Sequence, residues 1–236
     1  MSKNVTKDYE MTRAEKIDYF SRLNDIPTIA NGNGKTGKAC LTWSLPVEPT
    51  CNHDAPCYKN KVCYCLKGCQ AFANVVGAYY KNWRLYNENP ESYEEKCFNL
   101  IRYSGLKLVR CFDCGDLPDE NYLELLVRVA KKLPDVRFLS YTKKYNIVNN
   151  WLDKGNEFPT NFTMRFSAAD KNWEVPNPHH LPMAFIDFTD KSLNPEIPRN
   201  AYRCKGTPDP KDQEHTCSIC QMCWRKNVNS VVFSQH

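Results

Sequence analysis

Residues 106–112 read LKLVRCF, and the pattern that they begin recurs as far as residue 188. A short apolar run of this kind is typical of a buried strand. Further strands are predicted over residues 136–141 (VRFLSY), 161–167 (NFTMRFS) and 183–188 (MAFIDF), with an earlier one over 41–45 (LTWSL). Helices are predicted between them over 119–133, capped by Asp119, and over 145–153. This alternation predicts right-handed parallel strand–helix units.

The predicted fold is therefore α/β, an open or partial parallel β/α barrel. We expect residues 1–30 to form a helical extension, with Thr12 and Glu15 as a capping box. Residues 31–190 would form the partial barrel, including a cysteine-rich loop at 51–69 and two helices over 70–85 and 92–104. Residues 191–236 would form a cysteine-rich C-terminal extension, with no helix before Trp224 and a short strand over 230–233.

Small and polar residues follow three of the predicted strands. In parallel α/β folds the functional residues gather at the carboxyl ends of the strands. Helix caps and turns also place small and polar residues there, and they account for some of these positions. These positions make up the predicted ligand-binding set: Gly115, Asp116, Thr142, Lys143 and Ser167.

The chain has thirteen cysteines in 236 residues. Met1–Glu10 is polar and lacks a signal-peptide core, and no apolar run approaches the length of a membrane span. We therefore expect a cytoplasmic protein without a membrane partner. Disulfides are rare in a reducing compartment, so metal or cluster binding is favoured over a disulfide scaffold. Cys97 and Cys111 are expected to be buried core residues, whereas Cys40 and Cys114 could be core residues or ligands.

Five cysteines crowd into residues 51–69. Cys51, Cys57 and Cys63 are evenly spaced, and Cys65 and Cys69 add a closer pair. Clustered thiolates suit soft metals and iron–sulfur clusters. Three protein thiolates would leave one iron open to a substrate, whereas four would close the cluster. The sequence does not decide which of the five bind.

A second thiol set occupies the C-terminal segment: Cys204, Cys217, Cys220 and Cys223. Four thiolates suit tetrahedral zinc or a four-iron, four-sulfur cluster. The Cys-x2-Cys-x2-Cys spacing favours the cluster over zinc. One or two iron–sulfur clusters are therefore predicted, with zinc as the alternative.

The loop over residues 31–38 reads NGNGKTGK. It lacks the P-loop pattern, because Ala39 stands where a Ser or Thr should be and a strand, not a helix, follows. We interpret it as a flexible basic loop.

Several short motifs resemble the phage and mobile-element family called gene product eighty-eight. They are GKTGK (34–38), SLP (44–46), TC (50–51), CY (63–64), KG (67–68), GD (115–116), YTK (141–143), FSA (166–168) and SVVFSQH (230–236). The match begins near residue 30 and extends to the end of the chain.

A more distant resemblance is to radical S-adenosylmethionine (SAM) enzymes. They have a partial parallel barrel, three cysteines in a loop after the first strand and a glycine-acid motif after the second. By this resemblance Cys51, Cys57 and Cys63 would bind the cluster, and Gly115 and Asp116 would bind the amino end of SAM. The C-terminal cysteines would hold an auxiliary cluster. The chain departs from the usual cysteine spacing, since Phe72 follows Cys65-x3-Cys69 where the third cysteine belongs.

Two functional hypotheses follow. The first is an iron–sulfur enzyme acting on an unknown substrate, for which the resemblance implies a radical-SAM-like reaction. The second is a zinc- or cluster-stabilised module without catalysis, whose lysines contact nucleic acid: Lys35, Lys38, Lys59, Lys61 and Lys67. The net charge of +5 permits nucleic-acid binding without arguing for it.

Overall fold

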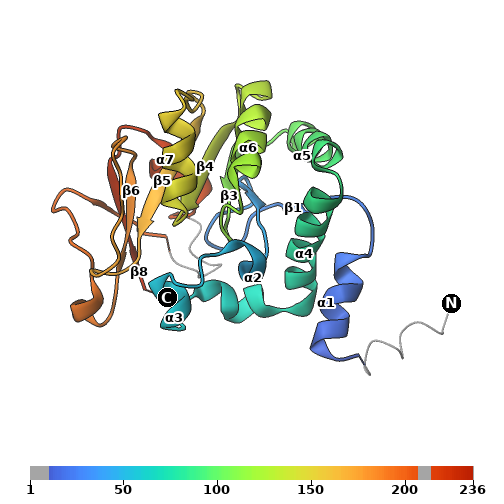
Figure 1. The fold of residues 1–236 in the computed structure, drawn as a ribbon, viewed down its shortest axis with the longest axis horizontal. Coiled ribbons are helices and arrows are strands. Elements are labelled where there is room, and N and C mark those ends of the chain that lie inside the picture. The colour runs from blue at the N-terminus through green and yellow to red at the C-terminus, as the bar shows by residue number, and fades with distance from the viewer. Residues whose placement is uncertain (1–10, 207–213, 236) are drawn as a thin grey trace.

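The computed structural model describes residues 11–206 and 214–235. Within them lies one open sheet in the order β1-β2-β3-β4-β5-β6-β8-β7. Its neighbours are parallel, except that β1 and β2 are antiparallel. The predicted α/β class with an open, mostly parallel sheet is confirmed (Figure 1). The strands are β1 (Ile29–Ala30), β2 (Leu41–Trp43), β3 (Leu108–Cys111), β4 (Arg137–Thr142), β5 (Phe162–Ala168), β6 (Met183–Asp187), β7 (Tyr202–Arg203) and β8 (Ser230–Ser234).

The longer helices lie close to their predicted positions. They are α1 (Arg13–Ser21), α4 (Ala73–Glu88), α5 (Pro90–Ser104), α6 (Glu120–Lys132) and α7 (Tyr145–Asp153). Thr12 and Glu15 form the predicted capping box of α1, and Asp119 caps α6. α5 begins at Pro90, two residues before the predicted start, because Asn89 caps it and proline is well tolerated in a first helical turn. None of the helices in residues 11–206 and 214–235 is long and apolar enough to cross a membrane.

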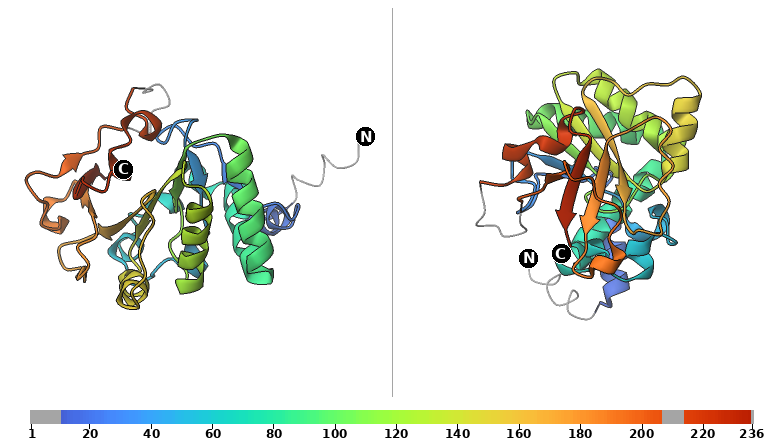
Figure 2. Two further views of the ribbon diagram at one scale, coloured as in Figure 1. Left: turned by 90° about the horizontal axis from the view of Figure 1, so that it is seen from above. Right: turned by 90° about the vertical axis from the view of Figure 1, so that its left-hand side faces the viewer.

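One face of the sheet packs against the helices. Val109, Phe138, Phe162 and Phe166 belong to the main apolar core, together with the apolar stripe of α6. Along β3, β4 and β5 they alternate with residues that are buried on the opposite face. In the left view of Figure 2, α5, α6 and α7 lie on this side and the C-terminal segment lies on the other.

The opposite face is covered by the C-terminal segment. Arg165 of β5 has no exposed surface and donates hydrogen bonds to the carbonyl oxygens of Cys223, Val228 and Arg225, at 2.8, 2.8 and 3.0 Å. Trp224 lies in a second apolar cluster on this face. Cys217–Cys220 forms a one-turn helix (α8), so the prediction of no helix before Trp224 was wrong. A single turn is too short to show helical periodicity in the sequence.

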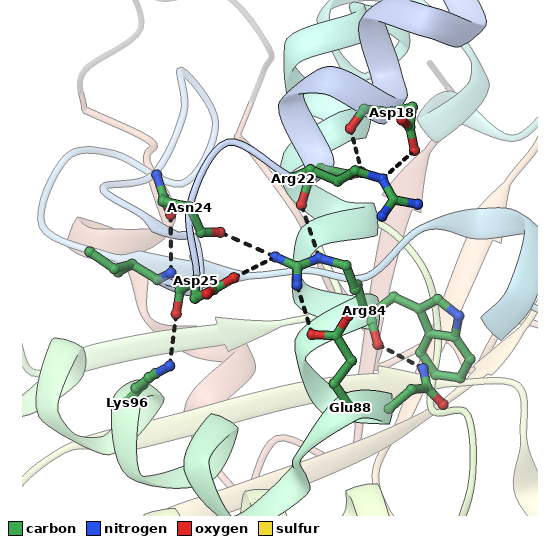
Figure 3. Close-up of polar contacts among 11 residues, drawn as sticks. Asp18, Arg22, Asn24, Asp25, Arg84, Glu88 and Lys96 are labelled. Atoms are coloured by element: carbon green, nitrogen blue, oxygen red, sulfur yellow. Dashed lines mark hydrogen bonds and ion pairs between the residues drawn. The ribbon is translucent and has the colours of Figure 1, made fainter.

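The N-terminal helix α1 packs against α4. Gly77 of α4 permits the close approach, since a Cβ there would lie 2.4 Å from the Cβ of Phe20. Figure 3 shows how Arg84 of α4 fastens the chain that follows α1. Its guanidinium pairs with Asp25 at 2.9 Å and also donates to the carbonyl oxygens of Ser21 and Asn24.

Candidate functional site at the carboxyl edge of the sheet

A cavity of about 390 Å³ opens at the carboxyl ends of the parallel strands. All members of the predicted ligand-binding set line it, so the fold brings together residues from three separate strand ends: Gly115, Asp116, Thr142, Lys143 and Ser167. The short helices α2 (Val47–Thr50) and α3 (Pro56–Lys59) lie at the same edge (Figure 1). The end of β8 completes the wall with Phe233, Ser234 and Gln235.

Asp116 fixes the geometry of this edge. Its carboxylate accepts hydrogen bonds from the Thr142 hydroxyl at 2.6 Å, the Lys143 backbone N–H at 2.9 Å and the Leu117 N–H at 2.7 Å. Burial raises the pKa of Asp116, although these donors and the Lys143 charge oppose the rise. Three of the carboxylate's bonds are thus used inside the protein, which holds the end of β4 against the loop after β3.

Gly115 is required by close packing. It has a φ of +79°, and a Cβ there would lie 2.4 Å from the carbonyl oxygen of Leu45. The left-handed conformation is accessible to glycine at little cost. This tight approach places the loop after β3 against the segment that follows β2 and leads into the cysteine-rich loop.

Lys143 lies close both to Asp116 and to the thiols Cys57 and Cys51. Burial alone would lower the pKa of Lys143, but Cys57 and Asp116 nearby outweigh burial and raise it. The lysine therefore stays cationic at neutral pH. A cation beside thiols stabilises their ionised form, which is the form that binds metals.

The N-terminal thiols form one wall of the cavity. Cys51, Cys57, Cys63 and Cys65 all line it. Burial raises the pKa of Cys51, and a hydrogen bond with Cys65, with burial second, raises that of Cys63. Cys65 is buried and also contacts Cys114. Cys114 is therefore a neighbour of the site, whereas Cys97 and Cys111 lie in the core as predicted.

The C-terminal thiols lie near one another and away from this cavity wall. Burial raises the pKa of Cys217 and of Cys223, and nearby Cys204 adds to the rise at both. The Cys220 Sγ lies 3.3 Å from the Tyr202 hydroxyl. In residues 11–206 and 214–235, no three His, Cys, Asp or Glu side chains are arranged to hold a single metal ion. The metal-ligand assignments for both thiol sets therefore stay predictions.

The family described as gene product 88 matches residues 19–226. The chain belongs to the gene product 88 family. No curated protein and no solved structure gives a significant match. The family description names no reaction or ligand, so the function of this gene product 88 chain must be argued from its site.

The sequence did not reveal a second group of cavity residues. Asn33 and Lys35 come from the 31–38 loop, Arg110 from the middle of β3 and Tyr141 from β4. An arginine within the apolar run 106–112 was the available signal, since a charge inside a buried strand requires a partner. Lys35 and Lys67, assigned to a nucleic-acid surface in one hypothesis, both line the cavity.

Proposed function

We propose that this gene product 88 chain is an iron–sulfur protein that holds a cluster at the cavity through Cys51, Cys57 and Cys63. The observation that carries the proposal is the wall of thiols facing a cavity at the carboxyl edge of a parallel sheet. A wall of this kind brings soft ligands to the place where α/β folds usually bind small molecules.

Thiolates are the donors that iron–sulfur clusters take. In a cluster each thiolate binds a different iron, so its ligands lie farther apart than those of a single ion. The absence of a single-ion arrangement among the described residues is therefore compatible with a cluster. A cavity of about 390 Å³ is also within the ordinary range for small-molecule sites.

The proposed chemistry assigns distinct tasks to the chain's own residues. An iron–sulfur cluster with an iron not held by protein can bind a substrate or transfer an electron. Lys143 supplies positive charge beside the thiols, and Asp116 holds the backbone of Lys143 in place. Ser167 and Thr142 contribute polar side chains to the cavity wall at the neighbouring strand ends.

A radical-SAM-like reaction is the finer form of the proposal. The open, mostly parallel sheet and the position of Gly115 and Asp116 after its second parallel strand are in keeping with it. SAM would then occupy the cavity. We propose the C-terminal set as a second metal site, for a cluster or zinc: Cys204, Cys217, Cys220 and Cys223.

Metal analysis tests the proposal directly. The chain is purified without oxygen, and its iron, acid-labile sulfide and zinc are measured together with its visible spectrum. We expect iron matched by sulfide and broad absorption near ~400 nm. Cys57→Ala should lower the iron content, whereas Cys97→Ala, the same change in the core, should not. A colourless protein carrying zinc alone would exclude the iron–sulfur function.

Reduced, iron-loaded protein is then incubated with SAM to test the finer form. Cleavage of SAM that depends on Cys51, Cys57 and Cys63 would support it. Clusters without any SAM binding would restrict the proposal to an iron–sulfur protein of another kind.

A further inference from the structure

A segment without acidic side chains lies beside the cavity. Residues 55–87 contain no Asp or Glu, although 27 of the 236 residues of the chain are acidic. The part over residues 59–72 continues from the end of α3 to the start of α4 and follows the lower edge of the molecule in Figure 1. Its three lysines are all exposed: Lys59, Lys61 and Lys67. The segment therefore presents a basic surface to solvent.

The same segment exposes large apolar side chains. Tyr64, Leu66 and Phe72 are 41%, 46% and 61% exposed. An exposed apolar group of this kind, bordered by charges, is typical of a surface that contacts another molecule. The Tyr64 hydroxyl donates a hydrogen bond to the carbonyl oxygen of Asp113, which holds the ring in place. A ring held in this way loses little freedom when a partner covers it.

The N-terminal helix adds a cation to this surface. Arg13 of α1 is exposed, and its guanidinium donates a 2.8 Å hydrogen bond to the carbonyl oxygen of Ala71, the residue before Phe72. Nearer the cysteines, Tyr64 and Lys67 line the cavity as well as being exposed. A partner lying along the segment would therefore meet alternating charged and apolar side chains and would reach the cavity.

The acidic side chains that precede the segment are already engaged. Asp54 pairs with Lys59 at 2.9 Å, and Glu48 accepts a 2.9 Å hydrogen bond from the hydroxyl of a neighbouring tyrosine. In residues 11–206 and 214–235, neither Lys61 nor Lys67 forms an ion pair. These two lysines therefore direct uncompensated positive charge towards solvent.

We propose that residues 59–72, together with Arg13, bind single-stranded nucleic acid and bring one nucleotide to the cavity. Lysine and arginine attract phosphate groups whatever the base sequence, and unpaired bases stack on exposed aromatic rings. A duplex hides the faces of its bases and could not use Tyr64 and Phe72. A cavity of about 390 Å³ is large enough for one nucleotide. Enzymes that modify a base take it out of the stack in this way.

This inference names the substrate class of the proposed iron–sulfur site and rests on that site for any chemistry. Binding to the surface itself requires no cluster, because the lysines and the aromatic rings are not cluster ligands. The two proposals can therefore fail separately.

Binding of labelled oligonucleotides tests the surface. Anaerobically purified full-length chain is titrated into fluorescein-labelled oligo-dT, oligo-U and a DNA duplex of equal length, and fluorescence anisotropy is followed at several sodium chloride concentrations. Both single strands should bind more tightly than the duplex. For three phosphate contacts, the logarithm of the association constant should fall with the logarithm of salt concentration with a slope of about −2.

Charge and stacking are separated by two variants. Combined Lys61→Gln and Lys67→Gln should reduce the size of the salt slope by about 1.4, since two phosphate contacts are lost. Phe72→Ser should weaken binding about tenfold at every salt concentration and leave the slope unchanged. Lys131→Gln on α6 and Tyr103→Ser on α5 are the matched controls, because both side chains are exposed on other helices.

Each result supports or overturns the proposal. A preference for oligo-U or for oligo-dT supports it and identifies RNA or DNA as the ligand. No binding of single strands, tighter binding of the duplex, or losses in the control variants equal to those in the surface variants overturn it. Iron-free protein that still binds single strands would refute the cluster and keep the surface. Iron-loaded protein that binds none would do the reverse.

Discussion

Arg165→Met removes the side chain that fastens the C-terminal segment to the sheet. The buried guanidinium makes three hydrogen bonds to backbone carbonyl oxygens of that segment. Burial lowers the pKa of Arg165, and no ion pair of this residue is found in the described part of the chain. The segment is therefore attached through hydrogen bonds from an isolated buried charge.

The expected loss of stability can be worked from these bonds. A hydrogen bond involving a charged group contributes about 1.5–3 kcal/mol, and part of the sum of three is offset by the cost of burying the guanidinium. Methionine fills similar space but leaves the three carbonyl oxygens without their donor. We expect a loss on the order of 4 kcal/mol. With a urea m-value of about 2.5 kcal/mol/M, the unfolding midpoint would fall by roughly 1.5 M.

Urea unfolding followed by tryptophan fluorescence measures this effect, since Trp224 is buried next to the attachment. Arg225→Met is the matched control, because that arginine lies in the same segment with an exposed side chain, and its change should stay within ~0.5 kcal/mol. Arg165→Lys should be intermediate, since one ammonium cannot reach three divergent carbonyl oxygens. Equal midpoints for Arg165→Met and Arg225→Met would refute the reasoning.

Two further predictions concern backbone packing and pH. Gly115→Ala should destabilise the chain by about 3 kcal/mol more than Gly155→Ala in the same assay. Both glycines have a positive φ, but only at Gly115 does a new Cβ meet backbone, the carbonyl oxygen of Leu45, whereas Gly155 faces open space; equal losses would contradict this. Hydrogen bonds, led by that from Lys191, lower the pKa of Asp187. The ionised Asp187 carboxylate therefore stabilises the folded state above about pH 5, and this stabilisation is lost progressively as the pH falls below about 4. Asp187→Asn should cost about 1 kcal/mol at pH 7 and clearly less at pH 2, measured by unfolding at both pH values, and a constant cost would contradict the assignment.

Strongly periodic segments could be predicted from the sequence. The apolar runs that became β3, β4 and β5, and the stripe that became α6, each carry the period of their own element. Parallel strands place their carboxyl ends at one edge, so Asp116, Thr142 and Ser167 could be grouped without any structure. The prediction that these three residues lie together thus followed from the parallel topology of the sheet.

Other parts of the site depend on contacts between distant residues. α2 ends just before the cysteine-rich loop and α3 lies within it, and each is a single turn, too short to produce a periodic signal. Lys35 and Arg110 are far apart in sequence, and only the folded chain places both against one cavity. The 31–38 loop was interpreted as flexible and basic, yet its backbone is bonded to Cys217 and Ser218. A glycine-rich sequence does not reveal such partners.

These bonds connect the C-terminal thiol set to one wall of the cavity, although the sequence presents the two as separate features. Arg165 attaches the segment that carries Cys223 to the sheet, and the same segment bonds to the loop that carries Lys35. Phe233, at the end of β8, then packs against Lys35 at the cavity. A metal bound by the C-terminal thiols would therefore stabilise one wall of the cavity although it lies outside it.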